Sequence, residues 1–140
     1  DKLAAAHPHT GYADQAQLAV ARMQVEDNQF RAALGRLQKI QADTRDEELK
    51  LVVRLRIARL QIEQNRLDDA LATLNSARPG AFAGRYAEVR GDALLAKGDR
   101  SGALKAYREA QSAQSGQAAA AAPGAGSDLL TLKINALTRS

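Results

Sequence analysis

The sequence predicts an all-α fold, a helical-hairpin solenoid of three repeats closed by a C-terminal capping helix. The chain has 140 residues, 45% of them apolar and 26% charged, which is the composition of a domain that folds in water. Ala and Leu contribute 30 and 18 residues, whereas Val and Ile together contribute only nine. Residue propensity therefore favours helix over strand. A recurrent spacing of small residues supplies the repeat.

Pairs of small residues recur along the chain, and the two members of each pair are 12 positions apart. The pairs are Ala21 with Ala33, Ala58 with Ala70, and Gly91 with Ala103. Two antiparallel helices approach to the short end of the interaxial range of about 8 to 10 Å only where the side chains at their crossing are small. Each pair therefore predicts a helical hairpin. Three hairpins are about the minimum for stacking into a stable array.

A residue that can end a helix lies inside each pair. Asn28, Asn65 and Gly98 each follow the first small residue by seven positions, and Asn and Gly tolerate the left-handed conformation found at helix ends. The predicted helices are 12–27 and 30–42, 46–64 and 67–77, then 83–97 and 100–112. The corresponding repeats cover 12–42, 46–78 and 83–112 of a single domain, 1–140.

Local signals set the ends of these elements. Thr44 and Glu47 have the spacing of a capping box, which predicts that the side chains of the two residues bond to each other's backbone amides at the start of the third helix. Pro79 followed by Gly80 ends the second repeat, because Pro cannot continue a helix. The chain begins at Asp1 without Met, and residues 1–11 are expected to be the end of a truncated helix followed by a turn.

The segment 113–127 is rich in Ala, Gln, Ser and Gly, and it is predicted to be a flexible insertion. Its run of Ala residues could also prolong the preceding helix. A short amphipathic helix follows over 128–138, with Ser127 and Asp128 as its cap and Leu130, Ile134 and Leu137 among its apolar residues. Such a helix is expected to cover the apolar side of the third repeat.

The spacing of these small residues resembles that of the tetratricopeptide repeat, which averages about 34 residues and carries Ala or Gly at its eighth position and Ala at its twentieth. More specific strings are ADTRDEELK at 42–50, LRIAR at 55–59, LATL at 71–74, RGDALLAKGD at 90–99 and LKINAL at 132–137. They resemble the YfgM family of membrane-anchored ancillary SecYEG translocon subunits over residues 12–137.

That resemblance implies a non-catalytic protein–protein interaction module on the periplasmic side of the bacterial inner membrane. Its implied partners are the SecYEG translocon, a PpiD-like periplasmic chaperone and emerging secretory chains. Contact with the membrane would be made only by an N-terminal anchor that lies outside this chain. The alternative is a tetratricopeptide scaffold of the cell envelope or cytosol that binds an unrelated peptide or protein.

The residues that could carry chemistry have simpler explanations. His7 and His9 are the two His of a chain without Cys, and they flank Pro8 in a turn with no carboxylate cluster nearby to complete a metal site. The acidic groups at 46–48 and 68–69 could coordinate a hard cation, but both begin helices, where the helix dipole favours negative charge. No phosphate-binding loop or nucleophile elbow is present. We expect no enzyme activity, cofactor or metal.

Nucleic-acid binding is also not expected, although the net charge is +4 and the first helix of the second repeat is basic. Arg54, Arg56, Arg59 and Arg66 supply that charge. Arg56 is predicted to fall on a different helical face from Arg59 and Arg66, and only five aromatic residues exist to stack on bases. A solvated basic face explains these arginines better.

Superposing the repeats places residues of the first helices in rows along a concave surface. The candidate partner-binding residues occupy three rows: Leu18 and Leu55; Arg22, Arg59 and Asp92; and Val25, Ile62 and Leu95. Apolar rows beside two arginines suit an extended or helical segment that carries apolar anchors and carboxylates. The alternative is that the apolar residues pack internally and the arginines pair with Glu63 or Asp92, because periodicity cannot separate groove from core.

Overall fold

A computed structural model describes residues 11–118 and 125–139 of the chain. Its helices are α2 (Gly11–Glu26), α3 (Phe30–Asp43), α4 (Glu47–Glu63), α5 (Leu67–Asn75), the short 3₁₀ helix η1 (Gly80–Phe82), α6 (Ala83–Ala96), α7 (Arg100–Ala118) and α8 (Ala125–Thr138). Within the described ranges no strand is present. Of the segment expected to hold a truncated helix and turn, residues 1–10 lie outside the described residues, and Gly11 begins α2.

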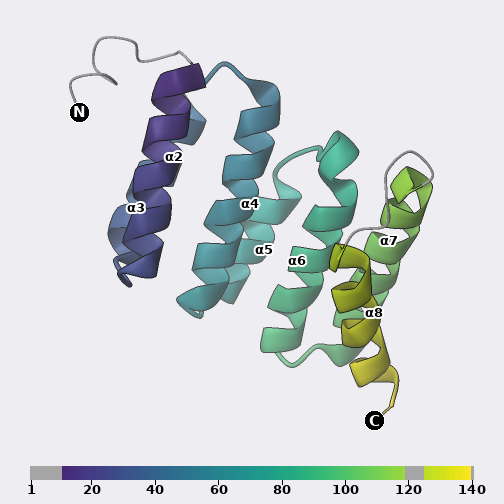
Figure 1. The fold of residues 1–140 in the computed structure, drawn as a ribbon. Helices are drawn as coiled ribbons and strands as arrows, with labels where there is room; N and C mark the ends of the chain where they lie inside the picture. The colour runs from purple at the N-terminus through teal and green to yellow at the C-terminus, as the bar shows by residue number, and fades with distance from the viewer. Residues whose placement is uncertain (1–10, 119–124, 140) are drawn as a thin grey trace.

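The helices form an array of side-by-side antiparallel hairpins (Figure 1). Helices α2, α4 and α6 make a front layer, and α3, α5 and α7 lie behind it. Helix α8 closes the far end, beside α6 and against α7. The predicted all-α solenoid of three hairpins and a capping helix is confirmed.

The first two hairpins turn at Asn28 and Asn65, and the third turns at Gly98. Their φ angles are +61°, +58° and +88°, which lie in the left-handed region. In each turn the following amide donates to a carbonyl five residues earlier, as for Gln29 N to Gln24 O at 2.7 Å. The helix stops predicted from residue type are therefore confirmed.

All six small residues of the three pairs are buried where the helices of each hairpin cross. In the first two repeats the pair begins with Ala21 or Ala58, and a leucine, Leu37 or Leu74, follows the second small residue by four positions. In the third repeat that position holds Tyr107, and the partner position is Gly91. A Cβ atom on Gly91 would lie 2.5 Å from Cε1 of Tyr107, so the ring occupies the space that an alanine methyl group would need.

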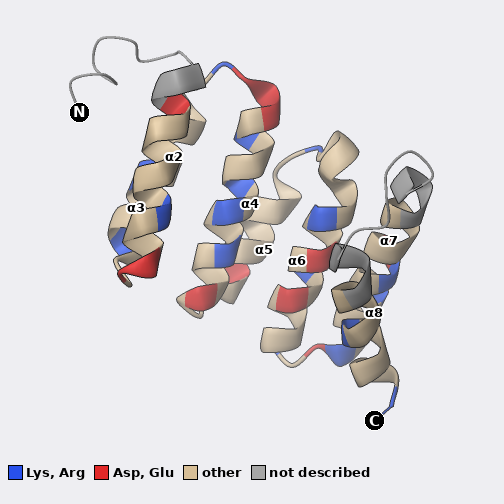
Figure 2. Cartoon of the chain, in the orientation of Figure 1, with Lys and Arg blue, Asp and Glu red and all other residues tan. Residues whose placement is uncertain are grey.

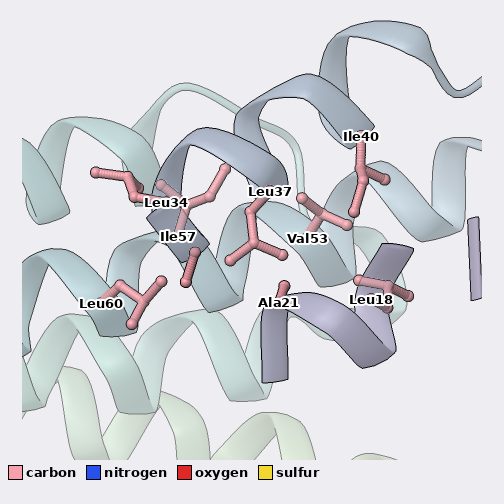
Figure 3. Packing of buried hydrophobic residues seen from close by; sticks show 9 residues of the cluster. Leu18, Ala21, Leu34, Leu37, Ile40, Val53, Ile57 and Leu60 are labelled. Atoms are coloured by element: carbon pink, nitrogen blue, oxygen red, sulfur yellow. The ribbon is translucent and has the colours of Figure 1, made fainter. Parts of the chain in front are cut away.

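Three apolar clusters make up the core: the first two each join one hairpin to the next, and the third joins the last hairpin to α8. The first joins Leu18 and Ala21 of α2, Leu34, Leu37 and Ile40 of α3, and Val53, Ile57 and Leu60 of α4 (Figure 3). The second contains Leu55 and Ala58 of α4 together with Tyr86 and Val89 of α6. The third places Leu130 and Ile134 of α8 against Ala87, Tyr107 and Ala110. Helices α4 and α6 therefore each contribute to two clusters.

The start of α4 differs from the predicted capping box. Asp46 is the N-cap residue, and its carboxylate accepts bonds from the amides of Glu48 and Leu49 at 3.0 and 3.2 Å. Thr44 is buried instead, where its hydroxyl donates to the Asp14 carboxylate of α2 at 3.0 Å. The Thr44 hydroxyl also accepts a bond from the Asp46 amide at 3.2 Å, but the amides of the first helical turn are bonded to the Asp46 carboxylate.

The segment predicted as a flexible insertion, 113–127, is helical at both ends. Helix α7 continues to Ala118, and α8 begins at Ala125 rather than after a cap at Ser127 and Asp128. Residues 119–124 lie outside the described residues. The prolongation of α7 follows from the high helix propensity of Ala and Gln in this segment.

We predict that Gly91→Ala lowers the free energy of unfolding by about 1 to 3 kcal/mol, because the added methyl group forces the buried Tyr107 ring to move. The matched control is Gly35→Ala in α3, where an added Cβ meets no atom within 4 Å. There the better helix propensity of Ala should stabilise the fold by about 0.5 to 1 kcal/mol. Urea denaturation followed by circular dichroism measures both. Equal stabilisation by the two variants would refute the close-packing explanation.

Candidate functional site

The structure separates the predicted partner-binding residues into buried and exposed groups. Leu18 and Leu55 are only 5% and 6% exposed and lie within the first and second apolar clusters. Val25 and Ile62 are half-buried and pack against the same clusters. Leu95 is 38% exposed, and Arg22 and Arg59 are exposed. The internal-packing alternative is therefore correct for Leu18 and Leu55.

A hollow of about 260 Å³ lies between α2 and α4 in the front layer. It is lined by Ala21, Arg22, Val25, Leu37, Arg56, Arg59 and Leu60. We call it the α2/α4 hollow. Four of these residues give it an apolar floor, and three give it guanidinium groups. Four lining residues were not among the predicted site residues: Ala21, Leu37, Arg56 and Leu60. Leu37 comes from the second helix of its hairpin, and the other three lie outside the superposed rows.

Arg56 shares this hollow with Arg59, so its predicted placement on a different helical face is wrong. Residues three apart on a helix are neighbours on its surface, and a hollow beside the helix is reached from both positions. Figure 2 shows basic residues on both α2 and α4 in this part of the array.

Arg56 is partly buried next to two other positive charges. Partial burial, followed by the positive charges of Arg22 and Arg59, lowers the pKa of its guanidinium group from the ordinary value. Within the described ranges, no carboxylate forms an ion pair with Arg22, Arg56 or Arg59. The predicted pairing of the two row arginines with Glu63 or Asp92 is therefore not formed.

Asp92, the third member of the same row, is engaged within the chain. Lys133 of α8 places its Nζ 3.0 Å from Asp92 Oδ1 and 2.9 Å from Glu88 Oε2. The Tyr107 hydroxyl donates to Asp92 Oδ1 at 2.5 Å, and Lys133 Nζ lies 5.6 Å from the centre of the Tyr107 ring. We call these four residues the α6–α8 polar cluster. Sequence reasoning missed it because Lys133 is far from Asp92 along the chain.

The α6–α8 polar cluster shifts the pKa values of two of its members upward. Burial raises the pKa of the Tyr107 hydroxyl, and the hydrogen bond to Asp92 and the nearby negative charges raise it further. Burial alone would lower the pKa of Lys133, but its bonds to Glu88 and Asp92 outweigh that cost and raise it. Lys133 therefore stays charged and holds α8 against α6.

The described part of the chain offers no other obvious chemistry. It contains no group of three or more His, Cys, Asp or Glu residues arranged to hold a metal ion. His7 and His9 lie outside the described residues. Of the helices described, none combines the length and the apolar character needed to cross a bilayer.

Comparison with known proteins agrees with this geometry. A family model described as a tetratricopeptide repeat-like domain matches residues 1–139. The chain belongs to the tetratricopeptide repeat-like family. Family and fold together indicate an interaction module and not an enzyme.

Three relatives of this tetratricopeptide repeat-like domain are each named "Ancillary SecYEG translocon subunit". The protein from Escherichia coli strain K12 is 38% identical over 99% of this chain and 63% of its own length. The proteins from Haemophilus influenzae and Aggregatibacter actinomycetemcomitans are 35% and 37% identical over 76% and 73% of this chain. They are covered over 52% and 50% of their lengths. The chain thus spans between half and about two thirds of these relatives.

A solved structure shares the fold. The crystal structure of PcrH from Pseudomonas aeruginosa superposes with a TM-score of 0.73 and covers 92% of this chain and 94% of its own. Sequence identity is 16%, so the likeness concerns the fold alone.

We predict that Lys133→Met lowers the free energy of unfolding by about 2 kcal/mol, because it leaves two partly buried carboxylates facing each other without a cation. The matched control is Lys97→Met, which removes an exposed ion pair with Asp68 and should cost less than about 1 kcal/mol. Chemical denaturation measures both variants. Equal losses would show that the α6–α8 polar cluster adds nothing beyond a surface ion pair.

Proposed function

We propose that this chain is the protein-interaction domain of an ancillary subunit of the Sec translocon, and that it works on the periplasmic side of the inner membrane. The observation that carries the proposal is the match of 99% of this chain to a protein named as such a subunit, at 38% identity. A hairpin solenoid with an exposed front layer suits this role, because such arrays bind other polypeptides along an extended surface.

The proposed partners are the SecYEG translocon itself, a PpiD-like periplasmic chaperone and secretory chains as they emerge. The relatives extend beyond the part that this chain matches, and an N-terminal membrane anchor is proposed in that remainder. Such an anchor would hold the front layer close to the translocon. A high local concentration allows a surface of modest affinity to engage its partners.

The proposed contact surface is the front layer of α2, α4 and α6. Arg22 and Arg59 are exposed there beside the half-buried Val25 and Ile62, and Leu95 adds an exposed apolar residue on α6. Leu18 and Leu55 support these positions from the core, and Asp92 is engaged by Lys133. The part of the surface available for a partner therefore includes Arg22, Val25, Arg59 and Ile62 on α2 and α4 and Leu95 on α6.

Site-specific photocrosslinking of the full-length protein in its native membrane tests the proposal. A photoreactive residue at position 95, in the front layer, should capture a SecYEG subunit or a periplasmic chaperone. The control position is Lys39 on α3, in the rear layer, whose side chain is 80% exposed. Capture from position 95 of unrelated proteins alone would favour the alternative, a tetratricopeptide scaffold with a different partner, and would reject the translocon assignment.

A further inference from the structure

Arg22 and Asp92 occupy equivalent positions in the first and third repeats, but the helix junctions beside them differ in charge. At the C-terminal end, Asp92 of α6 receives the ammonium group of Lys133 from α8, the next helix beside it, at 3.0 Å. At the N-terminal end, the equivalent residue is Arg22 of α2, and the next helix, α4, brings Arg56 and Arg59. The first junction thus places like charges where the last one has an ion pair.

Nothing in the described part of the chain neutralises this first junction. Other arginines are engaged: the Arg54 guanidinium donates to the Ser76 hydroxyl, and Arg66 pairs with Asp69 at 2.9 Å. Arg22 and Arg59 are exposed and Arg56 is half-buried, so all three can be reached from outside. An anion placed among the three guanidinium groups would attract all of them. Lys133 has the corresponding role between Glu88 and Asp92, where one cation lies between two carboxylates.

The surface next to these cations determines what kind of anion fits. The α2/α4 hollow has a floor of Ala21, Val25, Leu37 and Leu60. Filling it with an apolar side chain removes apolar surface of both partners from water. No aromatic side chain lines it, so it offers nothing on which a nucleic-acid base could stack. Cations at the rim and an apolar floor together fit a carboxylate next to an aliphatic group.

We infer that the α2/α4 hollow binds a protein segment in which an Asp or Glu lies beside a Leu, Ile or Met. The aliphatic side chain enters the hollow, and the carboxylate accepts hydrogen bonds from the guanidinium groups of Arg22, Arg56 and Arg59. This inference rests on the proposed role as a protein-interaction module, and it specifies the chemistry of the partner.

Selection from a phage-displayed library of random peptides tests the inference on the whole 140-residue chain. Peptides enriched on the chain should carry an acidic residue beside a large aliphatic one. The most enriched peptide is then synthesised with a fluorescent label and titrated by anisotropy. Changing its acidic residue to Gln, or its aliphatic residue to Ser, should each weaken binding by about tenfold or more.

Variants of the chain locate the binding site. Arg56→Gln should weaken binding of the labelled peptide by about tenfold, whereas Arg54→Gln, on the same helix but bonded to Ser76, should leave it unchanged. Circular dichroism checks that helicity is retained, which we expect because replacing Arg56 relieves repulsion.

Several results would overturn the inference. These are enrichment of peptides without an acidic residue, equal effects of the Arg54 and Arg56 variants, or binding of a DNA oligonucleotide that Arg56→Gln abolishes. The outcome is separable from that of the proposed function. Peptide binding without crosslinks to the translocon would support the α2/α4 hollow as a binding site and reject the translocon role. Crosslinks without selective peptide binding would support the translocon role and reject the hollow as the binding site.

Discussion

The close approach of two helices in each hairpin is the constraint on which this structure depends. The crossing tolerates a methyl group opposite Leu37 or Leu74 but only a hydrogen atom opposite Tyr107, which is why the third pair begins with Gly91. Once the hairpins are closed, their apolar sides can be buried only against the next hairpin. The three shared clusters, the layered arrangement and the need for a terminal helix all follow from that requirement.

The same arrangement determines where a partner can bind. Stacking buries residues such as Leu18 and Leu55, so the front layer retains a narrow strip of side chains between neighbouring helices. At the α8 end this strip is closed by the α6–α8 polar cluster. At the α2 end it stays open, with three guanidinium groups around an apolar floor. The α6–α8 junction is therefore neutralised within the chain, whereas the α2–α4 junction keeps three cations that can pair with another molecule.

The sequence predicted what depends on local chemistry and on regular spacing. Asn28, Asn65 and Gly98 end helices through their own backbone preference, and the small residues mark each crossing whatever surrounds them. Contacts between distant positions were not predictable in this way. The Thr44 hydroxyl donates to Asp14 of another helix, and Lys133 contacts Asp92 across a sequence separation of 41 residues. Leu18 and Arg22 lie one turn apart, so periodicity could not show that only the first is core.

Helices α4 and α6 each belong to two of the apolar clusters, and this sharing determines how disturbances spread through the molecule. Unfolding of one hairpin exposes the apolar residues of the next hairpin to water. Each hairpin is therefore coupled to the next, as in a one-dimensional chain of nearest-neighbour interactions. If a bound segment stabilised α2 and α4, the stabilisation would be passed to α6 through the contacts of α4, and it would decrease with distance along the array. The first hairpin, which carries the open α2/α4 hollow, is therefore coupled to the end covered by α8 only through α4 and α6.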